Sequence, residues 1–335
     1  MSTLSSTLSS VQDPPRPPRF EPPARVMVVA GKGGVGKTTI AAALAYLAAA
    51  SGIDVLIVEV EGKSGLPQLF DHSESLAYDE AVLVEGGALG SGSAAVRART
   101  LTPDDALEEY LDDRGLGKIS RRLKSTGTLD VIATAVPGIK DILVLGKVKQ
   151  LEVAAASSGS PGLIIVDAPA SGHAVTFLSS AGGLVEAATV GPIRTQAADV
   201  SEMLSDPLRC QVMMVTLPEE TPVNEASETA FHLEDRAGVK LTPVVVNGIW
   251  PQIGPPDPTD LGRYNLDAPD LSRVEDAMAF RLARQASQAA QLVRLAELLP
   301  LEQVHAPYLF TTELGLEETR ALAVALGYGL DSVAR

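Results

Sequence analysis

The sequence predicts an α/β fold with a doubly wound, mostly parallel sheet, flanked by helices and carrying a helical insertion. Short apolar, β-branched runs recur along the chain, and each is followed by a polar residue or glycine. Stretches typical of helices separate these runs, which is the alternation expected of such a sheet. Hydrophobic residues make up 45% of the chain and aromatic residues only 4%. Small aliphatic side chains therefore build the core, as in parallel sheets covered on both faces.

The expected elements follow in chain order. A β-rich run at Arg25–Ala30 precedes a glycine and predicts the first strand. Thr38–Ala50 is rich in alanine and predicts a helix. The run VLIVEV at residues 55–60 has almost no polar residues and predicts a strand buried on both faces. Further strands are expected at Gly162–Val166, Val212–Val215 and Pro243–Val246, and further helices at Glu225–Arg236 and Val274–Leu299.

Composition along the chain predicts its organisation. Residues 1–24 are rich in Ser and Pro and poor in large apolar side chains, so we expect a disordered tail. Residues 25–335 are expected to form a single domain. Residues 71–130 begin with a glycine-rich hairpin candidate, GGALGSGS, and become charged and helical, so we expect an insertion or helical subdomain beside the sheet over about residues 71–160. Pro251–Pro269 is expected to be a long loop.

Charge and cysteine content exclude several classes of function. A net charge of −15 at pH 7 argues against a broad nucleic-acid surface. Cys210 is the only cysteine, so the chain cannot form an internal disulfide or a metal site of several thiolates. The sequence shows no apolar core of a signal peptide and no uninterrupted membrane span. We expect a cytoplasmic protein whose contact with membranes is at most peripheral.

One motif carries a specific chemistry. GKGGVGKT, at residues 31–38, matches the phosphate-loop pattern G-x-x-x-x-G-K-[ST], and it lies between a predicted strand and a predicted helix, as the pattern requires. In such a loop, backbone N–H groups and the helix N-terminus face phosphate oxygens. The loop residues expected to bind nucleotide are Gly31, Gly33, Gly34, Val35 and Gly36.

Three side chains of this motif have expected roles. Lys37 is expected on the β- and γ-phosphates, the Thr38 hydroxyl on Mg²⁺, and Thr39 on an α-phosphate oxygen. The motif therefore predicts a protein that uses ATP or ADP together with Mg²⁺.

Lys32, directly after the first glycine, is an additional lysine. A lysine at this place resembles the deviant Walker A loop of one branch of P-loop ATPases. That branch includes ParA and MinD proteins, the nitrogenase iron protein, and the arsenite-pump and tail-anchored-protein-targeting ATPases. The resemblance implies that Lys32 reaches the phosphates of a facing subunit and supplies positive charge in trans for phosphoryl transfer. Hydrolysis would then require a homodimer, or a heterodimer with a paralogous subunit.

Two further stretches resemble the arsenite-pump and tail-anchor-targeting family. LIVEVEGKSGLPQLF, at residues 56–70, resembles the first switch, and the water-activating aspartate of the family falls on Glu61, whose side chain is one methylene longer. IVDAPASGHAVTFL, at residues 165–178, resembles the second switch. The resemblance implies that Asp167 contacts Mg²⁺ through water, and that Gly172 and His173 sense the γ-phosphate and move a helix.

The resemblance extends to the nucleotide's base, and it covers roughly residues 25–330. Asn247, after the strand VVV, takes the place of an asparagine that recognises the adenine edge, for which a side-chain amide is suited. Glu219 falls at the nucleotide rim near the partner subunit. Pro307–Phe310 is the candidate for the final strand and the adenine-side loop.

Other family features are missing. A single cysteine cannot form the arsenite-binding cluster or a zinc-pinned dimer, so no zinc is expected. Val136–Glu152 resembles a helix at the edge of a client groove, and its apolar positions fit a smaller groove or the core equally well. The sequence therefore predicts an ATP-binding and ATP-hydrolysing dimeric switch of the arsenite-pump type that acts on an unknown client protein. The alternatives are a ParA- or MinD-like positioning ATPase and a non-hydrolysing regulatory subunit of a heterodimer.

Overall fold

The computed structural model describes residues 18–60, 65–112, 138–169, 171–187, 191–252, 254 and 268–334. Within these residues, nine strands form one sheet in the order β3-β4-β2-β5-β1-β6-β8-β9, and β7 also pairs with β6. Every pairing is parallel except that of β3 with β4. The strands are β1 (Val26–Ala30), β2 (Val55–Val60), β3 (Ala81–Val84), β4 (Val96–Leu101), β5 (Leu163–Asp167), β6 (Cys210–Thr216), β7 (Lys240–Leu241), β8 (Val244–Ile249) and β9 (Gln303–Pro307).

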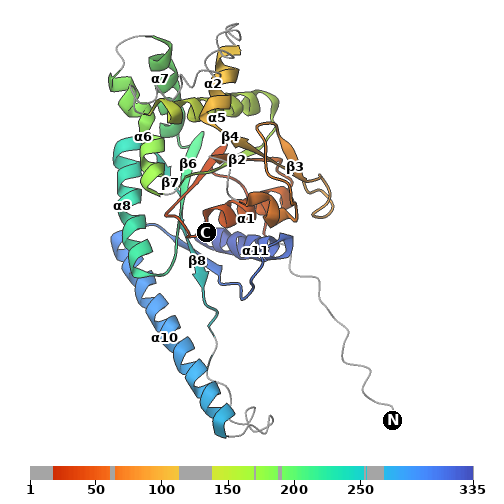
Figure 1. Cartoon of the computed structure of the whole chain (residues 1–335), viewed down its shortest axis with the longest axis vertical. Coiled ribbons are helices and arrows are strands. Elements are labelled where there is room, and N and C mark those ends of the chain that lie inside the picture. Colours follow the sequence, from red (N-terminus) through yellow and green to blue (C-terminus); the bar gives the residue numbers. More distant parts are fainter. Residues whose placement is uncertain are drawn as a thin grey trace.

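Helices cover both faces of the sheet (Figure 1). One face carries α5, α6, α7 and α8, and the other carries α1, α11 and the short 3₁₀ helix η1. α10 packs on α8, and one of its ends extends well beyond the body of the molecule (Figure 1). The helices are α1 (Lys37–Ala50), η1 (Leu66–Phe70), α2 (Pro103–Asp112), α5 (Ile139–Ser158), α6 (Ser171–Ala187), α7 (Pro192–Ser205), α8 (Glu220–Ala237), α10 (Ala268–Leu298) and α11 (Leu316–Val333).

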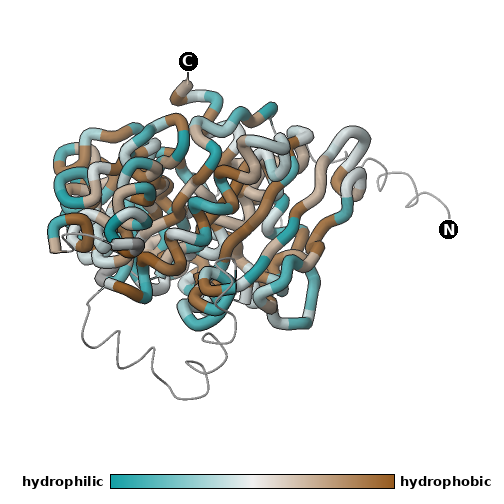
Figure 2. The backbone as a smooth tube through the Cα atoms, turned by 90° about the horizontal axis from the view of Figure 1, so that it is seen from above, coloured by the Kyte–Doolittle hydropathy of each residue, from teal (hydrophilic) through white to brown (hydrophobic). Residues whose placement is uncertain are grey.

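The core consists of two apolar layers, one on each face of the sheet. Successive side chains of a strand point to opposite faces. Val26 and Val28 of β1 accordingly pack in one layer, and Met27 and Val29 pack in the other. All of β1 is buried, which explains its continuous apolar run. The hydrophobic strands pass through the interior of the molecule (Figure 2).

The doubly wound, mostly parallel sheet predicted from the sequence is confirmed, and each expected strand and helix is present with ends shifted by a few residues. The expectation for residues 71–130 needs a correction in its first part, while residues 113–130 lie outside the described residues. The glycine-rich segment does connect a hairpin, but its strands β3 and β4 extend the main sheet beside β2 and do not lie in a separate subdomain. All residues of β4 except the half-buried Arg97 are buried, and the polar residues of this strand concealed its burial in the sequence.

The two ends of the domain also differ from expectation. Phe20 and Ala24 fall inside the segment expected to be disordered, yet both are buried. The backbone N–H of Phe20 donates to Ser51 Oγ at 2.9 Å, which ties this segment to the end of α1. The final strand, β9, ends at Pro307 and does not begin there.

None of the helices in the described residues is long and apolar enough to cross a membrane.

Candidate nucleotide-binding site

The candidate site lies where the carboxyl ends of the parallel strands β1, β5, β6 and β8 meet. The phosphate loop follows β1, Asp167 is the last residue of β5, and Asn247 lies near the end of β8. The strand order brings these segments together although they are far apart in the sequence. This edge is where open α/β sheets bind their ligands.

The phosphate loop packs so closely on the sheet that two positions require glycine. A Cβ built on Gly31 would lie 2.3 Å from the carbonyl oxygen of Val215 in β6. A Cβ built on Gly36 would lie 2.3 Å from Asn247 Nδ2, and Gly36 has a φ of +92°, which side chains rarely adopt. The loop is therefore held against β6 and β8 by contacts that only glycine permits.

Lys37 and Thr38, at the start of α1, face the end of β5. Thr38 Oγ1 donates a hydrogen bond of 2.6 Å to Asp167 Oδ2, and Lys37 Nζ donates one of 3.2 Å to the carbonyl oxygen of Lys32. Burial raises the pKa of Asp167 to about 6, and the negative charge of Glu59 adds to this effect, although Thr38 and Lys37 oppose it. Burial lowers the pKa of Lys37, against the charge of Asp167. A carboxylate and an ammonium group thus share a poorly hydrated site.

The residues around Asp167 fit a hard divalent cation. Asp167 Oδ1 is buried and has no hydrogen-bond partner among the described residues, so it is available to a cation or to its bound water. The Thr38 hydroxyl is a second oxygen ligand beside it. Mg²⁺ prefers oxygen ligands and usually takes only one or two from the protein, with substrate phosphates and water completing its shell. In the described residues, no group of three or more His, Cys, Asp or Glu side chains forms a metal cage.

Lys32 extends to a different part of the molecule from Lys37. Its Nζ lies 2.6 Å from Glu225 Oε1 in α8, and the two side chains are 40% and 34% exposed. The ammonium group of Lys32 is therefore directed toward α8. The sequence did not indicate this partner, because Glu225 is one of several acidic residues spaced along an amphipathic helix.

Asn247 and Glu219 both make contacts that were not predicted. Asn247 Nδ2 donates to the carbonyl oxygen of Val35 at 2.9 Å, which places this side chain directly on the phosphate loop. Glu219, just before α8, pairs with Arg284 of α10 at 2.6 Å. The contact of Asn247 with adenine and the position of Glu219 near a partner subunit stay predictions.

For the remaining predicted site residues, the structure gives mainly the element in which each one lies. Gly33 and Gly34 lie in the turn before α1, and Thr39 lies in the first turn of that helix. Gly172 and His173 lie in the first turn of α6, where His173 is exposed. Glu61 lies outside the described residues, so its role in the first switch stays a prediction.

An aromatic cluster follows β8 and β9; the sequence indicated the segment Pro307–Phe310 but not its contact with Trp250. The ring centroid of Trp250 lies 5.9 Å from the ring centroid of Tyr308 and 5.3 Å from that of Phe310. Tyr308 also lies next to Gly248, because a Cβ built there would be 3.8 Å from its ring. These residues come from loops after β8 and β9, and no sequence spacing connects them. They form an aromatic cluster beyond the ends of β8 and β9.

Comparison with known proteins agrees with this geometry. The sequence profile of the anion-transporting ATPase family matches residues 24–187. ATPase BagA of Mycobacterium tuberculosis is 35% identical over 250 residues, which cover 73% of this chain and 71% of that protein. The arsenical pump-driving ATPase of Acidiphilium multivorum is 27% identical over 289 residues, 82% of this chain and 44% of the relative. That of Escherichia coli is 28% identical over 271 residues, 74% of this chain and 42% of the relative.

The sheet, the phosphate loop and the Thr38–Asp167 contact define a P-loop NTPase of the α/β class. The chain belongs to the anion-transporting ATPase family, which includes the arsenical pump-driving ATPases. It spans less than half the length of the two arsenical pump-driving relatives that it matches.

Proposed function

We propose that this chain binds Mg·ATP, hydrolyses it to ADP and phosphate, and works as a dimeric switch. The observation that carries the proposal is the contact between Thr38 and Asp167 beside Lys37, at the end of a glycine loop. Relatives named as ATPases support the activity. An empty glycine turn would not need a buried carboxylate with an unused oxygen at this place.

Each group has a proposed role toward the nucleotide. Backbone N–H groups of the loop and the N-terminus of α1 bind phosphate oxygens. Lys37 exchanges the Lys32 carbonyl oxygen for the β- and γ-phosphates. Thr38 and Asp167 hold Mg²⁺, which neutralises charge on the phosphates when bound. Asn247 binds the adenine edge, and its present donation to Val35 means that base recognition and loop geometry are coupled through one side chain.

The proposed dimer supplies what one chain lacks. Lys32 is directed away from Lys37 and binds α8, which is consistent with a lysine that serves a facing subunit. We propose that Glu61 orients the attacking water, and that the second subunit is an identical or a paralogous chain. ATP would close the dimer, and hydrolysis with phosphate release would open it. Gly172 and His173 would carry the change into α6, which packs on α7 and α8.

The proposed switch acts on a client other than a thiol-bound metalloid. Cys210 is fully buried, and burial raises the pKa of its thiol to about 12. A buried, protonated thiol without a second cysteine does not capture arsenite, since metal and metalloid ligation needs thiolates. The client would be a protein that binds one state of the dimer better than the other.

The test is the rate of Mg·ATP hydrolysis per subunit, measured over a wide range of protein concentration. We expect the rate to rise and saturate, because the site is complete only in the dimer. Lys37→Ala is expected to weaken ATP binding about ten- to hundredfold, the typical effect of losing a charged hydrogen bond. Lys32→Ala, its matched control in the same loop, should still bind ATP but lose hydrolysis.

Two outcomes would contradict parts of the proposal. Hydrolysis by Lys32→Ala at the wild-type rate would exclude transfer of this charge between subunits. A flat, near-zero rate together with normal ATP binding would mean that the chain alone does not turn over. It would then serve as the regulatory half of a heterodimer or require a client.

A further inference from the structure

The carboxylate that binds Lys32 is fixed more firmly than the lysine. Glu225 Oε1 lies 2.6 Å from Lys32 Nζ. Its neighbours Val223 and Ala226 are buried on α8, so the helix cannot turn to carry the carboxylate away. Glu225 Oε2 is buried and has no hydrogen-bond partner among the described residues. The lysine, with its long flexible side chain, is therefore the partner that leaves when the pair opens.

The Lys32–Glu225 ion pair is weak enough for a bound nucleotide to displace it. Both side chains are more than a third exposed, and exposed ion pairs of this kind are weak because water screens them. A nucleotide triphosphate with Mg²⁺ presents several anionic oxygens at once, so it competes successfully for the same ammonium group. The pair is strong enough to direct Lys32 and weak enough to yield to phosphates.

We propose that Glu225 is a positioning residue for Lys32, which it holds against α8 until the nucleotide of a facing subunit displaces it. This inference rests on the dimeric switch proposed above. It assigns to α8 a part in the control of assembly, because each chain must open one Lys32–Glu225 pair before the dimer closes. Glu225 thereby raises the protein concentration at which the dimer forms.

The consequence is measurable because two pairs open in each homodimer. If each pair contributes a factor of about three, which is typical of an exposed pair, their removal strengthens the dimer about tenfold. Glu225→Gln removes the charge and keeps the shape of the side chain. Glu228→Gln is the matched control, since it makes the same charge change one turn further along α8, at an exposed residue.

The experiment compares the wild-type full chain with Glu225→Gln, Glu228→Gln and Lys32→Ala. Hydrolysis per subunit is measured against protein concentration with Mg·ATP. Assembly is measured by sedimentation with a slowly hydrolysed ATP analogue. We expect Glu225→Gln to reach half of its maximal rate at about tenfold lower concentration, with the same plateau and the same melting temperature as the wild type. Glu228→Gln should follow the wild-type curve.

The outcomes separate this inference from the proposed function. If Glu225→Gln reaches half of its maximal hydrolysis rate at the same protein concentration as the wild type, or at a higher one, the proposed role of Glu225 is wrong. If Lys32→Ala is inactive in the same experiment, the dimeric switch itself is not contradicted. If neither the wild type nor Glu225→Gln assembles at the highest concentration, the ion pair is not what keeps the chains apart, and the inference fails. Wild-type hydrolysis by Lys32→Ala contradicts the switch itself.

Discussion

Asp167 illustrates how a residue with a proposed role in Mg²⁺ binding can oppose stability. Its carboxylate is buried, and the resulting rise of its pKa to about 6, from an ordinary value of 3.8, means that ionisation is unfavourable in the folded chain. A shift of about two units corresponds to about 3 kcal/mol. Because the folded pKa is the higher one, this residue favours folding at low pH, and the benefit is lost as the pH rises through about 6.

We therefore expect Asp167→Asn to stabilise the nucleotide-free protein while it abolishes hydrolysis. The amide oxygen can still accept the Thr38 hydrogen bond, and the cost of a buried charge disappears. The free energy of unfolding should rise by about 1–2 kcal/mol at pH 8, and the gain should shrink toward pH 4. Denaturant unfolding with a chelator present measures both values. A variant less stable than the wild type at pH 8 would show that the ionised carboxylate is not costly.

For individual residues, the sequence indicated the candidate site where its residues belong to local motifs, and it missed the contacts that depend on packing. Lys37 and Thr38 belong to one continuous motif, and Asp167 follows an apolar strand in a recognisable string. Glu225 lies almost 200 residues from Lys32, and Tyr308 lies about 60 residues from Gly248. Only the three-dimensional fold brings the members of each pair together; for Gly248 and Tyr308, it is the pairing of β8 with β9 in the sheet.

Among the elements, strands buried on both faces were predictable and edge strands were not. β1, β2 and β5 read as continuous apolar runs because helices cover both of their faces. β4 carries two arginines and lies next to the edge strand β3, so its pattern resembles a charged segment. Arg97 of β4 binds Asp54 and Glu80, contacts that a linear sequence does not reveal.

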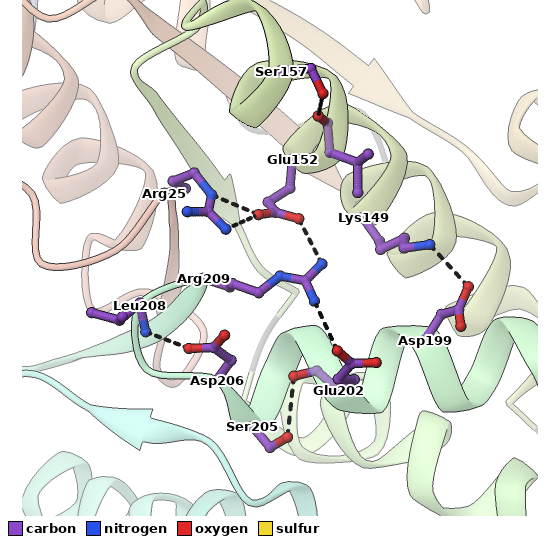
Figure 3. Close-up of polar contacts among 11 residues, drawn as sticks. Arg25, Lys149, Glu152, Ser157, Asp199, Glu202, Ser205, Asp206, Leu208 and Arg209 are labelled. Atoms are coloured by element: carbon purple, nitrogen blue, oxygen red, sulfur yellow. Dashed lines mark hydrogen bonds and ion pairs between the residues drawn. The ribbon is translucent and has the colours of Figure 1, made fainter.

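Ion pairs connect the helix α5 to the amino-terminal ends of β1 and β6 (Figure 3). The candidate site lies at the opposite, carboxyl-terminal ends of these strands. Glu152, whose side chain is 1% exposed, binds Arg25 at 2.6 Å and Arg209 at 2.7 Å. Arg25 directly precedes β1, and Arg209 directly precedes β6. Burial alone would raise the pKa of Glu152, but the hydrogen bonds and charges of Arg209 and Arg25 together lower it.

We expect Glu152→Gln to reduce the free energy of unfolding by roughly 2–3 kcal/mol, because it leaves two arginines without the buried carboxylate that they share. The effect should be largest at neutral pH. A lowered pKa means that the stabilisation is present above the ordinary range of a glutamate and is lost as the pH falls through the folded pKa.

Glu202→Gln is the control for these ion pairs, since Glu202 binds the same Arg209 at 3.7 Å but is 78% exposed. Its removal should change stability by less than about 1 kcal/mol. Thermal or denaturant unfolding at pH 7 and pH 4 measures both variants. Equal losses from Glu152→Gln and Glu202→Gln would mean that burial does not strengthen the ion pairs of Glu152.

For the molecule as a whole, charge separates the proposed switch from ATPases that move along DNA or membranes. The net charge is −15, and a protein that binds a polyanion needs the opposite sign over its contact surface. We expect no ATP-dependent pelleting with DNA or with anionic liposomes at physiological salt, under conditions where the same preparation hydrolyses ATP. Lowering the salt should not create binding, because repulsion between like charges lengthens in range as screening falls. Pelleting that requires ATP and is lost in Lys37→Ala would instead place the chain with the positioning ATPases.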